Sequence, residues 1–475
     1  MKIPYRKAAV LMIFALMLMA CGQGGGTTST QPGGAADTAT TAETGATAEE
    51  GATAETAAIT ETSATADTAA TAEMVATAGS AATAAPVGAT GEQVTITYGM
   101  WDQTQQESMQ RVADAFEQAN PNIQVEIQLV PWAQYWDNLK TAAAGGELFD
   151  VFWMNGPFFP FYASRGLLLD LTPYMDGGDF DAAKHPASIL ETYTFEGKRY
   201  GGPFYFDTIG LFYNKDLFDA AGVPYPDASW DWNKLREVAG QLTKAPDQYG
   251  MVVWWNSQEQ TYNFIFSNGG EVVQDDKCRL TDPQTVEAVQ YLVDLIYKDK
   301  VSQEPAAMGD DPTIFFQQGK AAMITTGSWN VNAYKKSITG FEWDVAPLPK
   351  APTGQSVSVI SGLGNVVNAK TENPDAAWAW VQFIASEQGQ QIIAEAGQPP
   401  TYEGIAKAWQ DANPEINTQV FLDAAKNAHG YPSGIEFEEW NPILNNAMAE
   451  VFANRIPVEQ GLQQACSEID AILQK

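Results

Sequence analysis

The sequence has little positive charge. Its 475 residues include 26 Lys and Arg against 58 Asp and Glu, which gives a formal net charge of −32 at pH 7. Removing an N-terminal leader that contains Lys2, Arg6 and Lys7 would leave about −35. Such acidity argues against binding to nucleic acid and against a chain that lies flat on anionic lipid.

Histidine is scarce, and motifs for metal or cofactor chemistry are missing. His185 and His429 are the only histidines. No H-E-x-x-H motif and no metal-spaced set of Cys and His is present. The acidic residues Asp176, Asp179 and Asp181 lack the twelve-residue pattern of a calcium loop, and we interpret them as a turn. We therefore expect no metal and no cofactor.

Motifs for nucleophilic catalysis and phosphate binding are also incomplete. Ser361 lacks the first glycine of G-x-S-x-G, since position 359 is Val. Gly319-Lys320 lacks the P-loop pattern, because Ile314 and Ala321 occupy two of its positions. The sequence thus offers no catalytic residue.

Long apolar runs are rare as well. The run from Ala8 to Ala20 follows Lys2, Arg6 and Lys7 and ends directly before Cys21. It is short for a membrane span but fits the core of a signal peptide over residues 1–20. A small residue before Cys21 predicts a lipoprotein, with Cys21 lipidated and the chain anchored outside the cytoplasm. The alternative is an ordinary signal peptide with an incidental cysteine.

Residues 22–92 contain no aromatic side chain, no Lys and no Arg. Gly, Thr and Ala dominate this stretch, which cannot bury enough apolar surface to offset its chain entropy. We expect residues 21–92 to form the lipidated cysteine and a disordered tether.

Cysteine is limited to three residues. Besides Cys21, the chain has Cys278 and Cys466. In an exported protein these two can form a disulfide, or both can be buried thiols. The spacing of the two cysteines in the sequence does not decide between these two states.

From Val94 onward, strand and helix patterns alternate. The expected elements are strands at 94–98, 123–130 and 150–154, with helices around 109–116 and from Trp132 to Gly145. This alternation predicts an α/β fold with a parallel sheet. Because ligands of such sheets bind beyond the carboxyl ends of the strands, Trp101, Asp102 and Asn155 are expected on one rim.

The middle and end of the chain show a second α/β pattern. It predicts strands at 209–213, at the end of 315–324 and at 356–359, and helices at 232–242, 283–298, 376–386, from Asn417 and from Asn441. Trp254 and Trp255 are adjacent in a strand-like run and would point to opposite faces, and we favour Trp255 for a cleft. About 380 residues after the tether are enough for two lobes.

Four segments carry a family resemblance: 111–155, 197–226, 315–329 and 373–402. They include "ANPNIQVEIQ", "GKRYGGPFYFDTIGLFYNKDLFDAAGVPYP", "FFQQGKAAMITTGSW" and "NPDAAWAWVQFIASEQGQQIIAEAGQPPTY". In this order the chain resembles the family 1 extracellular solute-binding proteins, the maltose-binding-like sugar receptors of ABC importers. The resemblance extends over nearly all of residues 93–475.

The resemblance implies a two-lobed periplasmic-binding-protein fold of type II. Lobe 1 would contain 93–206 and 357–398, and lobe 2 would contain 207–356 and 399–475. Crossings are expected near 204–210, 346–358 and 396–402, with a cleft that closes like a hinge. The implied protein is a monomer that delivers a carbohydrate to membrane-embedded ABC importer subunits, held to the bilayer through acylated Cys21.

A sugar site needs aromatic faces for its C–H surfaces and amides or carboxylates for its hydroxyls. The resemblance implies that Trp329, Asp207 and Trp440 contact the ligand. The alternatives are core packing for the tryptophans and a helix cap or hinge salt bridge for Asp207. The resemblance also suggests that the backbone at Gly362 contacts the ligand, as do Gln398 and Tyr402 at the last crossing.

Five further tryptophans are expected to be structural, because they lie in a strand or an amphipathic helix or, for Trp230 and Trp232, because they resemble the family's helix start. They are Trp153, Trp230, Trp232, Trp378 and Trp380.

Three other functions stay open. A surface glycosidase would need a pair of carboxylates across the bond, and no spacing singles one out. A receptor for iron, polyamines or peptides is a second possibility. The sequence lacks a Tyr-Tyr pair for ferric ligands, while aromatics and carboxylates also suit polyamines. A sensor or adhesin without a transport partner is the third.

Overall fold

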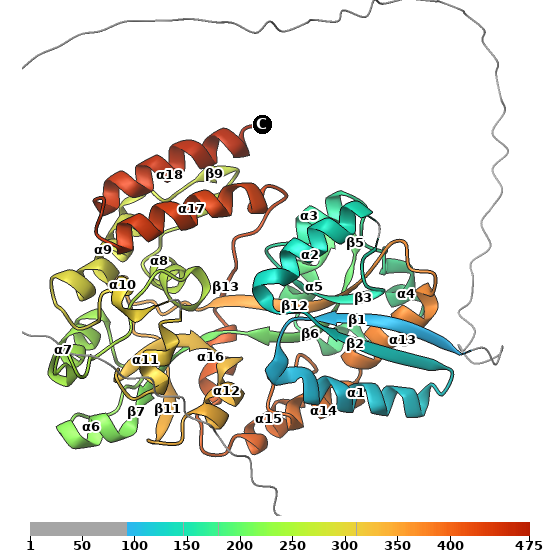
Figure 1. Cartoon of the computed structure of the whole chain (residues 1–475), viewed down its shortest axis with the longest axis horizontal. Coiled ribbons are helices and arrows are strands. Elements are labelled where there is room, and N and C mark those ends of the chain that lie inside the picture. Colours follow the sequence, from blue (N-terminus) through green and yellow to red (C-terminus); the bar gives the residue numbers. More distant parts are fainter. Residues whose placement is uncertain (1–92, 146, 179, 310) are drawn as a thin grey trace, which may run out of the picture. The chain divides into compact units, whose positions relative to one another are not determined.

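The computed structural model describes residues 93–475 except 146, 179 and 310 (Figure 1). The predicted signal peptide, the lipidated Cys21, the tether and Asp179 lie outside the described residues. Within the described part, no helix is long and apolar enough to cross a membrane.

The first lobe is built around a six-stranded mixed sheet in the order β13-β12-β3-β1-β2, with β6 paired to β12. Strand β1 is parallel to β2 and β3, whereas β12 is antiparallel to β3 and β6. The strands are β1 Val94–Met100, β2 Ile123–Leu129, β3 Val151–Asn155, β6 Gly201–Asp207, β12 Val359–Val367 and β13 His429–Gly430. The predicted strand–helix–strand order up to Asn155 is confirmed.

Helices cover this sheet because their apolar residues recur on one side. In α1, Met109, Val112, Ala113 and Phe116 are buried, and Phe116 lies edge-on against Trp380. The other elements of the lobe are η1 Gln103–Gln105, α1 Gln106–Ala119, α2 Trp132–Gly145, α3 Phe159–Ser164, α4 Thr172–Gly177, η2 Ala182–Lys184, α5 Ala187–Thr192, β4 Thr194–Phe195, β5 Lys198–Arg199, α13 Pro374–Ala385 and α14 Glu387–Glu395.

The second lobe contains a three-stranded antiparallel sheet in the order β10-β7-β11. Its strands are β7 Ile209–Asn214, β10 Met323–Gly327 and β11 Trp343–Ala346. The surrounding elements are α6 Lys215–Ala221, α7 Trp232–Leu242, the π-helical turn η3 Ser257–Thr261, α8 Tyr262–Ser267, β8 Val273–Gln274, β9 Lys277–Cys278, α9 Pro283–Tyr297, α10 Pro305–Met308, α11 Thr313–Gln317, α12 Asn330–Ser337, α15 Ala406–Ala412, α16 Gln419–Ala425, α17 Phe437–Phe452 and α18 Val458–Leu473.

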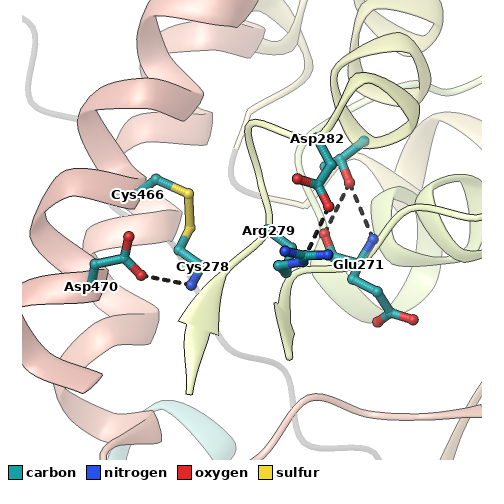
Figure 2. Close-up of a disulfide and its surroundings, with 7 residues drawn as sticks. Glu271, Cys278, Arg279, Asp282, Cys466 and Asp470 are labelled. Carbon is teal, nitrogen blue, oxygen red and sulfur yellow. Dashed lines mark hydrogen bonds and ion pairs between the residues drawn. A yellow bond between two sulfur atoms is a disulfide. The ribbon is translucent and has the colours of Figure 1, made fainter. Parts of the chain in front are cut away.

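A disulfide joins the β8–β9 hairpin to the C-terminal helix α18 (Figure 2). Cys278 and Cys466 are bonded across 188 residues of sequence. The Asp470 carboxylate, one turn further along α18, accepts the Cys278 backbone N–H at 2.7 Å. Of the two states that the sequence left open, the structure has the disulfide.

The chain leaves the first sheet and enters the second within two residues. Strand β6 ends at Asp207 and β7 begins at Ile209. The return connection differs from the prediction, since the strand expected at 356–359 instead runs from Val359 to Val367. Ser358 precedes it. Its hydroxyl accepts the Ile209 N–H at 2.8 Å and its backbone carbonyl accepts the His429 N–H at 2.8 Å, so this residue braces the crossing.

Candidate functional site

A pocket of about 490 Å³ lies where the two lobes meet. The first lobe contributes residues that follow β1 and β2, the last residue of β3, two residues of β6 and residues near the start of β12. The second lobe contributes residues of η3 and the start of α12. Five predicted residues line this pocket together: Trp101, Asp102, Asn155, Asp207 and Trp329.

Aromatic packing holds Trp101 in the first-lobe wall. Its ring centroid lies 5.1 Å from that of Trp132, 5.0 Å from Tyr135 and 5.0 Å from Trp153, all in edge-to-face geometry. Such pairs stabilise one ring orientation beyond the area they bury. Trp132 also lines the pocket and keeps 45% of its surface exposed, so it forms an open aromatic rim.

Asp102 caps the short helix η1, and both of its oxygens are occupied. One carboxylate oxygen accepts hydrogen bonds from the Thr104 N–H at 2.8 Å and the Thr104 hydroxyl at 2.7 Å. The other accepts from the Gln105 side-chain amide at 2.9 Å, which also lies 3.1 Å from the Tyr205 hydroxyl. The carboxylate is therefore fixed at the pocket edge before any ligand arrives.

Asn155 ends β3, and cross-strand pairing places it beside β12. It pairs with Leu363, another lining residue. The Ser361 hydroxyl donates to the Asn155 side-chain oxygen at 3.0 Å. Trp101, Asp102 and Asn155, which were expected on one rim because they come at the carboxyl ends of neighbouring strands, therefore do share this rim.

Asp207 is the last residue of β6 and lies opposite Ser361 of β12. It is only 7% exposed, and one of its oxygens accepts the Ser328 hydroxyl at 2.7 Å. Burial raises the pKa of Asp207 to about 7. The hydrogen bond from Ser328 opposes this rise, and the charge of Asp102 adds to it.

In the second-lobe wall, hydrogen bonds hold the buried carboxylate of Glu259. It accepts the Thr326 hydroxyl at 2.7 Å and the Asn256 amide at 2.9 Å, while its backbone N–H donates to the Asn256 side chain at 2.9 Å. Asn330 joins the network by donating to the Thr326 hydroxyl at 2.6 Å. Burial raises the pKa of Glu259 to about 7, the Thr326 hydrogen bond lowers it and Asp311 raises it further.

Trp329 directly precedes α12, and its ring folds back over Gly327. A Cβ atom added to Gly327 would lie 1.8 Å from the Trp329 ring carbon Cζ3, a distance that no packing tolerates. The glycine in "TTGSW" therefore makes room for the tryptophan that lines the pocket.

Three predicted contacts lie elsewhere. Trp440 is 1% exposed in the second-lobe core, edge-on to Phe437, because α17 turns this side chain inward. Trp255 is half-buried beside the same core, and its ring N–H donates to Asn445 at 3.2 Å. Gly362 sits within β12, and its carbonyl accepts the Tyr193 hydroxyl at 2.7 Å.

The two predicted residues of the last crossing do not line the pocket either. Gln398 is 3% exposed, since the chain there is enclosed by packing. Tyr402 lies edge-on to His185, at 5.6 Å between ring centroids, in a separate cavity of about 340 Å³. Burial lowers the pKa of His185 to about 4.

The strand expected across Trp254 and Trp255 is not formed. Trp254 is 7% exposed and packs in the second-lobe core, so neither tryptophan reaches the pocket. The tryptophans expected to be structural are all buried, and they are Trp153, Trp230, Trp232, Trp378 and Trp380.

Sequence reasoning missed more than half of the pocket lining. Trp132 comes just after β2, so the strand-end argument could have included it. Gln103 and Thr104 follow β1 in the same way. Nothing in the sequence marked the others, which are Tyr205, Asn256, Gln258, Glu259, Asn330, Ala333, Ser361 and Leu363.

Two of the acidic residues interpreted as a turn make local contacts, and the turn is not formed at Asp176, which lies in α4. Asp176 in α4 pairs with Arg199 at 3.1 Å, and Asp181 caps η2. Among the described residues, no group of three or more His, Cys, Asp or Glu could hold a metal ion.

Two lobes around an aromatic and polar pocket define a solute-binding protein. The family model described as bacterial extracellular solute-binding protein matches residues 101–391, and this chain belongs to that family. Its members are binding proteins that work outside the cytoplasm.

Solved structures share the fold. An ABC substrate-binding protein of Listeria monocytogenes in complex with cycloalternan is 26% identical, with a TM-score of 0.75 over 80% of this chain and 99% of that one. The maltose-bound MalE3 of T. maritima is also 26% identical, with a TM-score of 0.69 over 79% and 99%. Among curated relatives, a maltodextrin-binding protein of Bacillus subtilis is 25% identical over 70% of this chain and 79% of its own length.

Proposed function

We propose that this protein is a carbohydrate receptor that binds a sugar or short oligosaccharide in the pocket and delivers it to an ABC importer. One observation carries the proposal. Trp101 and Trp329 come from opposite lobes and line one pocket together with Asp102 and Asp207. The relatives described above support the same ligand class, because each is named for a sugar or has a sugar bound.

The chemistry of the lining suits a sugar. Indole faces cover the apolar C–H surfaces of a sugar ring, and each buried aromatic removes about 150–250 Å² from water. Carboxylates and amides accept hydrogen bonds from hydroxyls, at about 1 kcal/mol net each. Micromolar affinity requires about −8 kcal/mol, which two or three aromatics and several such bonds supply.

Hinge closure and membrane attachment are further parts of this proposal. The lobes would divide at 93–206 with 357–398 and at 207–356 with 399–475, except that Asp207 and β13 belong to the sheet of the first lobe. Closure would bring Trp329 toward Trp101. Lipid on Cys21 would keep a monomeric receptor near the importer, with residues 22–92 as the tether. The receptor releases its ligand unchanged and is not an enzyme.

Calorimetric titration with mono- to trisaccharides tests the proposal. A one-site isotherm is expected for at least one sugar, and chromatography should show the same sugar intact afterwards. If no saccharide in the panel binds, the receptor proposal is wrong. If the sugar is cleaved, the protein is a glycosidase.

A further inference from the structure

The pocket is acidic and lacks a counter-charge. Asp102, Asp207 and Glu259 line it, and none of the sixteen described lining residues is Lys, Arg or His. None of these three carboxylates takes part in a salt bridge among the described residues. Three carboxyl groups around one cavity, each negative when ionised, favour a cation and repel an anion.

Asp207 is the carboxylate with an oxygen to spare. Both oxygens of Asp102 and both of Glu259 accept hydrogen bonds from protein groups. For Asp207, only one oxygen has a partner among the described residues, the Ser328 hydroxyl. A side chain that is 7% exposed and lines the pocket thus keeps one acceptor for a ligand.

The titratable groups facing Asp207 give it no positive partner. The charge of Asp102 acts on it directly, and Glu259 lies in the opposite wall of the same pocket. Tyr205 is the remaining titratable lining residue, and burial raises its pKa well above the ordinary value, so it stays neutral. A ligand has to bring any positive charge itself.

Building on the proposed receptor function, we propose that the pocket takes an amine-bearing saccharide whose protonated amine binds Asp207. Trp101 and Trp329 cover the faces of the sugar, and an aromatic face also attracts a nearby cation. Asp102 strengthens the local negative potential. Sugars that carry a carboxylate or phosphate are rejected, because the lining has no group to neutralise them.

A neutral sugar satisfies the same geometry less well. A sugar hydroxyl donates a hydrogen bond to the Asp207 carboxylate without bringing any charge. An ammonium donates the same bond and also brings the positive charge that no lining residue supplies. Burial already raises the pKa of Asp207 to about 7. An ammonium against this carboxylate would lower its pKa again, so binding near pH 7 releases a proton from Asp207.

Calorimetry with matched sugars tests the inference on the full chain. The probes are glucose, galactose and mannose with their 2-amino counterparts, cellobiose with the β-1,4 glucosamine disaccharide, and glucuronic acid. At pH 7, we expect at least one amino sugar to bind about fivefold or more tighter than its hydroxyl counterpart. Glucuronic acid should bind more weakly than glucose.

Asp207→Asn provides the matched variant, since it keeps the shape and removes the charge. We expect it to erase the advantage of the amine, while the control Asp247→Asn, an exposed aspartate outside the pocket, keeps it. If Asp207→Asn does not fold, wild-type titrations in two buffers of different ionisation enthalpy still count the released protons. Amino-sugar binding at pH 7 without proton release contradicts the inference.

The outcomes separate the two proposals. Neutral sugars that bind as tightly as amino sugars overturn this inference and leave the receptor proposal standing. No saccharide binding at all overturns the receptor proposal itself. Spermidine binding as tightly as the amino sugar shows that the amine alone suffices, which contradicts an amino-saccharide site.

Discussion

The two lobes hold their sides of the pocket by different means. In the first lobe, Trp101 is fixed by rings of Trp132, Tyr135 and Trp153. In the second lobe, hydrogen bonds to the buried Glu259 carboxylate tie η3 to the ends of β10 and α12. Aromatic packing is insensitive to pH, whereas a network around buried carboxylates depends on their ionisation. The aromatic part of the first wall is a fixed platform. The second wall, through Glu259, responds to pH, and so does Asp207 of β6, whose carboxylate accepts a hydrogen bond from Ser328 of the second lobe.

The largest effect should come from the disulfide of the second lobe. Replacing Cys278 and Cys466 by Ser removes a link across 188 residues. We expect the free energy of unfolding to fall by about 2–5 kcal/mol, because the unfolded chain gains freedom. Denaturant titration measures it, and the wild type under reducing agent is the matched control. Equal stability of all forms would show that α17 and α18 hold the lobe without the link.

The second-largest effect should come from the tryptophan of the responsive wall. Trp329→Ala should weaken sugar binding by about 2 kcal/mol or more, roughly 30-fold, as truncated aromatic anchors do. Tyr402→Ala is the matched control, since Tyr402 was predicted at the site but lines another cavity. Calorimetry compares the two. Affinity unchanged in Trp329→Ala would remove this residue from the site, and a loss in Tyr402→Ala would return Tyr402 to it.

Stability should depend on pH through Asp207. Its folded-state pKa is raised to about 7 from an ordinary 3.8, so the folded state binds more protons between about pH 4 and pH 7. Stability contributed by this group is therefore lost as pH rises through that window. Asp207→Asn should stabilise the ligand-free protein at pH 8 by on the order of 2 kcal/mol and have little effect at pH 4.

Thermal unfolding at both pH values checks this prediction, with Asp247→Asn as the control for removal of a surface charge. If Asp207→Asn raised the stability by the same amount at pH 4 and pH 8, ionisation of Asp207 would not be the cause of the gain. Trp101, in the platform wall, offers no titrating group, so its replacement should give a loss of affinity that is the same at both pH values.

The smallest expected effect concerns the position of the Trp329 ring against Gly327. Gly327→Ala places a Cβ against its ring and should reduce sugar affinity by about 1 kcal/mol, because the indole must shift. Gly240→Ala on α7 is the control, since a Cβ there meets open space. Helix propensity predicts that it stabilises the fold slightly. Calorimetry on both variants distinguishes them, and equal affinities would mean that the ring has room to move.

Local rules account for three of the five predicted residues that line the pocket. Trp101, Asp102 and Asn155 follow strands, and the carboxyl ends of neighbouring strands share an edge. Asp207 and Trp329 came from the family resemblance, and both line the pocket. These positions are set by chain connectivity, which a sequence displays directly.

The features that the sequence did not determine depend on long-range packing. For Trp440, the helical pattern of α17 was visible, but which face meets the core depends on α18. Glu259 becomes a site residue only because Thr326, 67 positions later, lies beside it. The state of Cys278 and Cys466 likewise required their Cα atoms to be placed 5.3 Å apart.

The tryptophans of the pocket also allow ligand binding to be followed by intrinsic fluorescence. Trp101, Trp132 and Trp329 are partly open to the cavity, while many of the 14 tryptophans are buried. Because indole emission shifts with local polarity, an arriving ligand that expels water from these rings changes the intrinsic fluorescence without any attached dye. Uptake and release can then be followed in real time, and single tryptophan replacements show which side of the cavity the ligand reaches first.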